Sequence, residues 1–193
     1  MDELYPRIYS ETRTMLFVDG ENFVMRYGQM HDARVKETRD EPVTPLGVNN
    51  AGVWFERDKA LWAQQLNPPP GGHVRMVRRY FYTSAPGDDP ARVAVAQWLK
   101  DRGFEAPRVF HRDKERGSKQ VDISLTTDML THAHRKHYNV AILVTGDEDY
   151  VPLVRAVQGE GARVHLWAFS KGLSPKLKME ADHFACLDGY FGV

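Results

Sequence analysis

The sequence predicts an α/β fold, a three-layer sandwich with a central, mainly parallel sheet of about five strands. Strand-like and helix-like segments alternate along the 193 residues, and this alternation favours a parallel sheet with right-handed crossovers. One segment, residues 139–145, is almost wholly hydrophobic, which is typical of a parallel strand covered on both faces. The length suits one well-packed core, so we expect residues 1–193 to form a single domain.

Apolar, β-branched and aromatic runs mark the expected strands, and capping signals mark the helices between them. The five strands are expected at residues 14–19, 73–83, 105–111, 139–145 and 162–169. Asp88 and Pro90 begin a helix that ends before Gly103. Residues 121–137 carry apolar side chains at a spacing of four, and residues 149–159 lead into a Gly-Glu-Gly break. These segments complete the expected alternation.

A polar segment, residues 28–50, interrupts this rhythm. It contains Pro42, Pro45 and Gly47, and we interpret it as an insertion within the single domain. A helix is expected after it, over residues 51–66, and a run of prolines and glycines then ends that helix before the second strand.

Composition limits the class of protein. The 26 Lys and Arg residues balance 26 Asp and Glu residues. Net charge alone therefore does not decide whether nucleic acid is a partner. A single cysteine, Cys186, excludes an internal disulfide framework and a Cys-rich zinc module. No apolar run approaches the ~20 residues that cross a bilayer, and the N-terminus is polar and acidic, unlike a signal peptide. We expect a cytoplasmic protein without a membrane partner.

Carboxylates directly follow two of the expected strands. Asp19 ends the first strand, and Asp147 and Asp149 follow the fourth. Ligands of open parallel sheets bind at the carboxyl ends of the strands, so we expect these acids to share a site. Each could instead cap the helix that follows it, but capping alone gives no reason for acids to recur at the same edge of the sheet.

Two further aspartates lie in the helix expected after the third strand. Asp122 lies near its start and Asp128 six residues later. Six steps of about 100° place Asp128 roughly 240° around the helix from Asp122, so both reach one site only if Asp122 precedes the regular helix. Asp122 is the favoured metal ligand and Asp128 a second candidate.

Acids gathered in one cleft repel each other and raise each other's pKa, and a hard divalent cation relieves this repulsion. Mg²⁺ or Mn²⁺ accepts carboxylate oxygens and keeps several waters. A metal held in this way activates water and stabilises charge on a phosphoryl group. The pattern therefore predicts hydrolysis of a phosphodiester bond.

Three blocks of the sequence resemble the signature blocks of NYN domains. They are the segments at residues 16–23 (LFVDGENF), 119–130 (KQVDISLTTDML) and 143–154 (LVTGDEDYVPLV). They occur in the family's order, and residues 181–184 resemble its usual ending. The similarity spans about residues 13 to 188, and it points to the PIN-like nuclease superfamily, close to the bacterial domain-of-unknown-function-88 branch.

The resemblance implies a metal-dependent active site of the ribonuclease type. By position in the motifs, Asp19, Asp122 and Asp147 would be metal ligands, with Asp149 and Asp128 in support. It also implies that Asn22 orients a ligand or a metal-bound water and that Thr145 forms a hydrogen bond near the metal or near the backbone at Gly146. Lys119 would contact a phosphate.

The expected substrate is a nucleic acid, and RNA is favoured. The basic loop of residues 112–119 contains Arg116 and ends at Lys119, so it could bring phosphate contacts to the metal site beside Asp122. A homodimer would lengthen this basic track, although nothing in the sequence requires one.

Other functions on the same residues stay open. A catalytically silent nucleic-acid-binding or regulatory module would carry the same acids. A haloacid-dehalogenase-type phosphatase would need Asp-x-Asp after the first strand, where Glu21 stands at the second position. A topoisomerase–primase-type domain would match Asp147 and Asp149 but would need a glutamate in place of Asp19. A zinc site at His132, His134 and His137 lacks identifiable further ligands, so a solvated or partly buried helix face is expected there.

Overall fold

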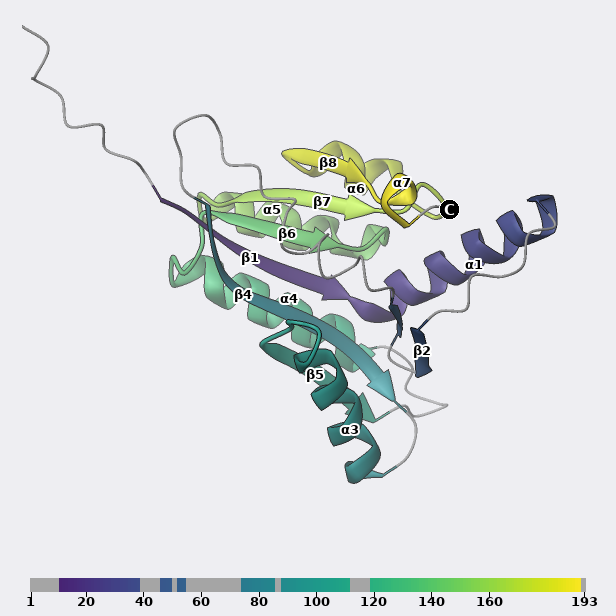
Figure 1. Cartoon of the computed structure of the whole chain (residues 1–193). Helices are drawn as coiled ribbons and strands as arrows, with labels where there is room; N and C mark the ends of the chain where they lie inside the picture. The colour runs from purple at the N-terminus through teal and green to yellow at the C-terminus, as the bar shows by residue number, and fades with distance from the viewer. Residues whose placement is uncertain are drawn as a thin grey trace, which may run out of the picture.

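A six-stranded sheet forms the centre of the computed structural model (Figure 1), and all its paired strands are parallel. The structure describes residues 11–38, 46–49, 52–54, 74–85, 88–111 and 119–191. In spatial order the strands are β5 (Ala106–His111), β4 (Val74–Ala85), β1 (Thr12–Asp19), β6 (Val140–Val144), β7 (Arg163–Ala168) and β8 (His183–Cys186). The predicted α/β sandwich is confirmed.

Helices cover both faces of the sheet (Figure 1). The first face packs against α4 (Lys119–His134), α5 (Val151–Gly159) and α6 (Pro175–Glu180). The second face packs against α1 (Gly20–Thr38), α3 (Asp89–Lys100) and α7 (Asp188–Phe191). No helix in the described ranges is long and apolar enough to cross a membrane.

The central strands explain why the sheet is so fully buried. Side chains of β1 alternate between the two cores, with Phe17 facing α4 and α5 and Val18 facing α1. Strand β6 pairs with β1 in register, Phe17 opposite Leu143 and Val18 opposite Val144. All five residues of β6 are buried, which accounts for the uninterrupted apolar run in its sequence.

The order of the strands determines where a ligand can bind. From β1 the chain proceeds through β4 to the edge strand β5, then returns through α4 to β6 on the other side of β1. The direction of winding therefore reverses between β1 and β6. At such a reversal, the connections leave the carboxyl ends of the two strands in opposite directions, and a crevice opens there.

Three segments differ from the sequence-based expectations. The helix predicted over residues 51–66 is wrong at residues 52–54, which form strand β3 (Gly52–Trp54) paired with β2 (Leu46–Asn49); the remainder lies outside the described residues. The first part of the proposed insertion, through Thr38, continues α1. Strand β8 was not predicted, because its half-exposed residues carry no apolar run.

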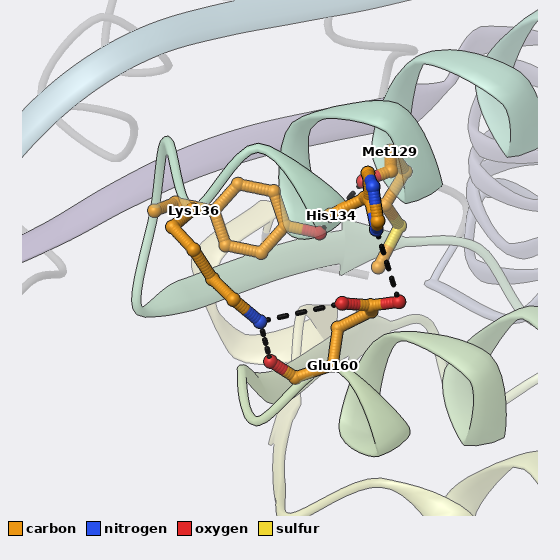
Figure 2. A network of polar contacts seen from close by, with 5 residues as sticks. Met129, His134, Lys136 and Glu160 are labelled. Carbon is orange, nitrogen blue, oxygen red and sulfur yellow. Dashed lines mark hydrogen bonds and ion pairs between the residues drawn. The ribbon is translucent and has the colours of Figure 1, made fainter.

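At the opposite edge of the sheet, the connection from α4 to β6 is held against the end of α5 (Figure 2). The Nζ atom of Lys136 lies 3.3 Å from a carboxylate oxygen of Glu160, and His134 contacts the other oxygen at 3.4 Å. His132 instead hydrogen-bonds with Tyr80 and His137, both at 2.8 Å. His134 therefore pairs with Glu160, whereas His132 and His137 contact each other.

Candidate active site

Asp19 is the most deeply placed acid at the carboxyl edge of the sheet. It is the last residue of β1, and Gly20 begins α1 directly after it. A Cβ atom on Gly20 would lie 2.7 Å from the carbonyl oxygen of Tyr82 and would overlap the ring of Phe81. The strand can therefore turn into the helix beside β4 only with glycine at this position, and this turn fixes Asp19 at the carboxyl edge of the sheet.

The side chain of Asp19 is buried, with only 4% of its surface exposed. Its Oδ1 atom accepts a hydrogen bond from the backbone N–H of Asn22 at 3.1 Å, and its Oδ2 atom accepts one from the Thr145 hydroxyl at 3.0 Å. Burial nevertheless raises the pKa of Asp19 to about 7, and the charges of Asp122 and Glu21 add to the increase. Neutral donors hold the carboxyl group in place, but they only partly offset the cost of its negative charge.

Asn22 and Thr145 join the ends of β1 and β6. The Oδ1 atom of Asn22 accepts a hydrogen bond from the backbone N–H of Gly146 at 3.0 Å. The Thr145 hydroxyl, which donates to Asp19, also accepts from the N–H of Asp147 at 3.3 Å. Thr145 therefore bridges Asp19 and the backbone of Asp147, and Asn22 holds the backbone of Gly146 beside them.

Asp147 caps the short 3-10 helix η1 (Glu148–Tyr150). Its Oδ1 atom accepts a hydrogen bond from the N–H of Asp149 at 3.1 Å, so the capping interpretation is correct for this residue. Capping does not exclude a second role, because Asp147 is exposed and its charge raises the pKa of Asp122. Asp149 is also exposed and acts on Asp122 in the same direction.

Asp122 reaches the group from the first turn of α4. Its Oδ1 atom accepts a hydrogen bond from the hydroxyl of the buried Tyr150 at 3.0 Å. Partial burial raises the pKa of Asp122, and the charges of Asp147, Glu21 and Asp149 raise it further. Acids from β1, α1, α4 and the loop after β6 therefore act on one another at a single edge of the sheet.

Sequence reasoning missed Glu21 and Tyr150 as members of this site. Glu21 accepts a hydrogen bond from the Ser84 hydroxyl on β4, and its charge acts on both Asp19 and Asp122. A signal for Glu21 was available, because it lies two residues after Asp19 in the turn that leaves β1. Tyr150 had no such signal, since its contact with Asp122 depends on how α4 packs beside α5.

Three predicted residues are not seen in this group. Asp128 accepts hydrogen bonds from the Tyr82 hydroxyl at 3.0 Å and from Nε of Arg108 at 3.3 Å. Asp122 lies within the regular helix, so the angular offset between the two aspartates holds and turns Asp128 toward β4 and β5. Lys119 begins α4, but its side chain and the whole of Arg116 lie outside the described residues.

The donor set suits a hard cation. The group offers carboxylate oxygens together with the Thr145 hydroxyl, and neither histidine nor cysteine takes part in it. Among the described residues, no three His, Cys, Asp or Glu side chains already surround one point closely enough to hold an ion. Mg²⁺ fits such a site, because it binds one or two carboxylates directly and completes its octahedron with water.

Comparisons with known proteins agree with this architecture. The chain is similar over 95% of its length to 97% of a crystal structure from Vibrio parahaemolyticus, a protein of unknown function, with a TM-score of 0.60 and 20% sequence identity. At that identity the likeness shows the fold alone. No curated protein matches the sequence. The family model described as the NYN domain matches residues 13–188, which is nearly the whole chain and includes every acid of the site. The chain therefore belongs to the NYN domain family, a family of PIN-like nucleases.

Proposed function

We propose that the protein is a Mg²⁺- or Mn²⁺-dependent nuclease that hydrolyses phosphodiester bonds in RNA. The observation that supports this most strongly is the convergence of Asp19, Glu21, Asp122 and Asp147 from separate segments, with the pKa of Asp19 and of Asp122 raised. Such an arrangement is costly unless a cation neutralises it. Membership of a PIN-like nuclease family supports the same reaction.

In this proposal Asp19, Asp122 and Asp147 hold the metal, while Glu21 and Asp149 bind its waters. When bound, the ion activates water and neutralises charge on the phosphoryl group. The protein's own contribution is orientation. Thr145 and the N–H of Asn22 fix the two oxygens of Asp19, and Tyr150 fixes one oxygen of Asp122. These contacts restrain Asp19 and Asp122 before the metal binds, so fewer side chains must be ordered when the site closes around the ion.

Recognition of RNA is assigned to the basic segment that leads into α4. Arg116 and Lys119 precede Asp122 by six and three residues, so phosphates bound there would lie next to the acids. Contacts of this kind position a strand without reading its sequence.

The decisive experiment measures cleavage of labelled single-stranded RNA in Mn²⁺, Mg²⁺ or EDTA. Wild-type protein is compared with Asp147→Asn and with the control Asp101→Asn, which changes an exposed aspartate at the end of α3. We expect metal-dependent cleavage that Asp147→Asn abolishes and Asp101→Asn preserves.

Equal cleavage by all three proteins would contradict the proposal. RNA binding without cleavage in any metal would instead support the alternative, a catalytically silent nucleic-acid-binding module on the same fold.

A further inference from the structure

Arg26 is a cation on α1 that forms no ion pair with the residues the structure describes. It lies on α1 one helical turn after Asn22, so the two side chains leave the same face of the helix. Its Nη1 atom donates to the side-chain oxygen of Gln29 at 3.2 Å. Within the described part of the chain Arg26 forms no ion pair, and its Nε atom is buried without an acceptor. The Arg26 charge is thus partly desolvated but not neutralised.

The loop after β7 packs directly against the Arg26 side chain. Gly172 has a positive φ of 77°, and a Cβ atom at this position would overlap three atoms of the Arg26 guanidinium. Glycine is therefore required both by the backbone conformation and by the side chain that lies over it. The guanidinium is confined by packing, so little rotamer freedom remains to be lost when it binds a ligand.

The same loop connects Arg26 to the acids. A Cβ atom on Gly146 would lie 2.9 Å from the carbonyl oxygen of Gly172, so the two glycines are in close contact. Gly146 in turn donates its N–H to Asn22 and precedes Asp147. Arg26 is therefore linked to the residue before Asp147 through the loop after β7, whereas Asp122 approaches from α4.

We propose that Arg26 is a phosphate-binding residue that contacts the RNA backbone next to the bond being cleaved. This inference rests on the proposed function, since the ligand is the substrate strand. A guanidinium binds phosphate oxygens through a planar set of N–H groups. A partly desolvated guanidinium without a carboxylate partner has already lost part of its hydration, so a phosphate gains more from it than from a solvated lysine. Arg26 would offset, at the β7 side, the repulsion between the acids and the incoming strand.

The test measures binding, so that it does not depend on cleavage. Fluorescence anisotropy of a short labelled single-stranded RNA is recorded in Ca²⁺ for wild type, Arg26→Gln, Arg26→Lys and the control Arg135→Gln. Arg135 follows α4 at the opposite edge of the sheet, so its substitution removes the same charge far from the acids. Salt titrations of each protein accompany the measurements, together with thermal unfolding.

We expect Arg26→Gln to raise Kd about tenfold, as loss of one charge-assisted hydrogen bond would. The slope of log Kd against log salt should decrease by roughly 0.7 for one lost phosphate contact on a single strand. Arg26→Lys should keep the slope but bind more weakly than wild type, and Arg135→Gln should resemble wild type. A purely structural role for Arg26 would lower Tm without changing the salt slope.

The inference would be overturned if Arg26→Gln bound RNA with the Kd and the salt slope of the wild type. It would also be overturned if the wild type did not bind RNA. The nuclease proposal is judged separately, by cleavage in Mn²⁺. An Arg26-dependent Kd without any cleavage would leave Arg26 as a phosphate contact and reject the nuclease. Cleavage in Mn²⁺ together with a Kd that Arg26→Gln does not change would support the nuclease and reject Arg26 as a phosphate contact.

Discussion

Tyr150 donates a hydrogen bond of 3.0 Å to Asp122, from the end of the 3-10 helix after β6 to the first turn of α4. Asp122, which precedes β6 in the chain, is thereby positioned by Tyr150, which follows β6. The hydroxyl lowers the pKa of Asp122, against the effects of burial and of neighbouring charge, and so favours the ionised form that a metal requires.

Tyr150→Phe should therefore weaken metal binding. Loss of a hydrogen-bond donor to a ligating carboxylate typically reduces metal affinity about 10- to 100-fold. Calorimetry with Mn²⁺ measures the affinity, and RNA cleavage measures activity. Tyr138→Phe is the matched control, because Tyr138 is also a buried tyrosine of the same core and donates to the carbonyl of Met129 at 2.8 Å, away from the acids. Equal effects of the two substitutions would contradict a role in the site.

Asp19→Asn should increase stability in EDTA at high pH. The pKa of Asp19 is about 7 in the folded protein against an ordinary value of 3.8. The folded state retains this proton between those values while the unfolded state loses it, so the free energy of unfolding falls as pH rises through this window. The free energy of unfolding decreases by at most about 4 kcal/mol across this window. Asparagine cannot ionise, so the variant does not lose this stability.

Urea unfolding of both proteins across this pH range measures the effect. We expect the stabilisation by Asp19→Asn to be largest above about pH 8 and to vanish below about pH 3, where both states are protonated. A constant difference at all pH values would show that Asp19 does not titrate in this range.

Divalent metal should raise the Tm of the wild type, and more so at alkaline pH. Binding to the folded state alone at about 100 times Kd adds roughly 2.7 kcal/mol, or roughly 5 to 10 °C for a chain of this size. Below the pKa of Asp19, metal must displace a proton, so the shift should shrink. Thermal unfolding with Mn²⁺ and with EDTA measures the increase in Tm. If Mn²⁺ raised the Tm of Asp147→Asn as much as that of the wild type, the metal would not bind at the acidic site.

Gly20→Ala should be strongly destabilising, because the new Cβ would meet the carbonyl of Tyr82 and the ring of Phe81. We expect a loss of about 2 kcal/mol or more. Gly28→Ala provides the contrast. Gly28 is also in α1, a Cβ there meets nothing within 4 Å, and alanine should stabilise the helix by about 0.5 to 1 kcal/mol. Denaturant unfolding that ranks the two variants in the opposite order would contradict the crowding at the β1–α1 turn.

The edge of the sheet at which the acids lie could be predicted from the strands that precede them. The apolar runs of β1 and β6 mark buried parallel strands, and parallel strands bring their carboxyl ends to one edge, so Asp19 and Asp147 were expected at the same edge. The sixth strand, β8, could not be found in this way. It lies at the edge of the sheet, with both its terminal residues exposed, so pairing with β7 defines it more than hydrophobicity does.

Contacts that depend on side-chain packing were beyond the sequence. Tyr150 and Asp122 are 28 residues apart and meet only because α4 and α5 lie side by side. The partners of Asp128 could likewise not be read from its helix, since Tyr82 and Arg108 come from two neighbouring strands. Arg26 belongs to none of the sequence motifs, and its packing depends on the positive φ of Gly172 in a loop that is distant in the sequence.

The hydrogen bond between Thr145 and Asp19 spans 126 residues, and the one between Gly146 and Asn22 spans 124. Closing so long a loop is a late and entropically costly event in folding. During synthesis, a chain that has emerged only as far as β5 carries Asp19 without the partners that fix it. The donor that fixes Oδ2 of Asp19 would then be in place only after β6 has docked beside β1.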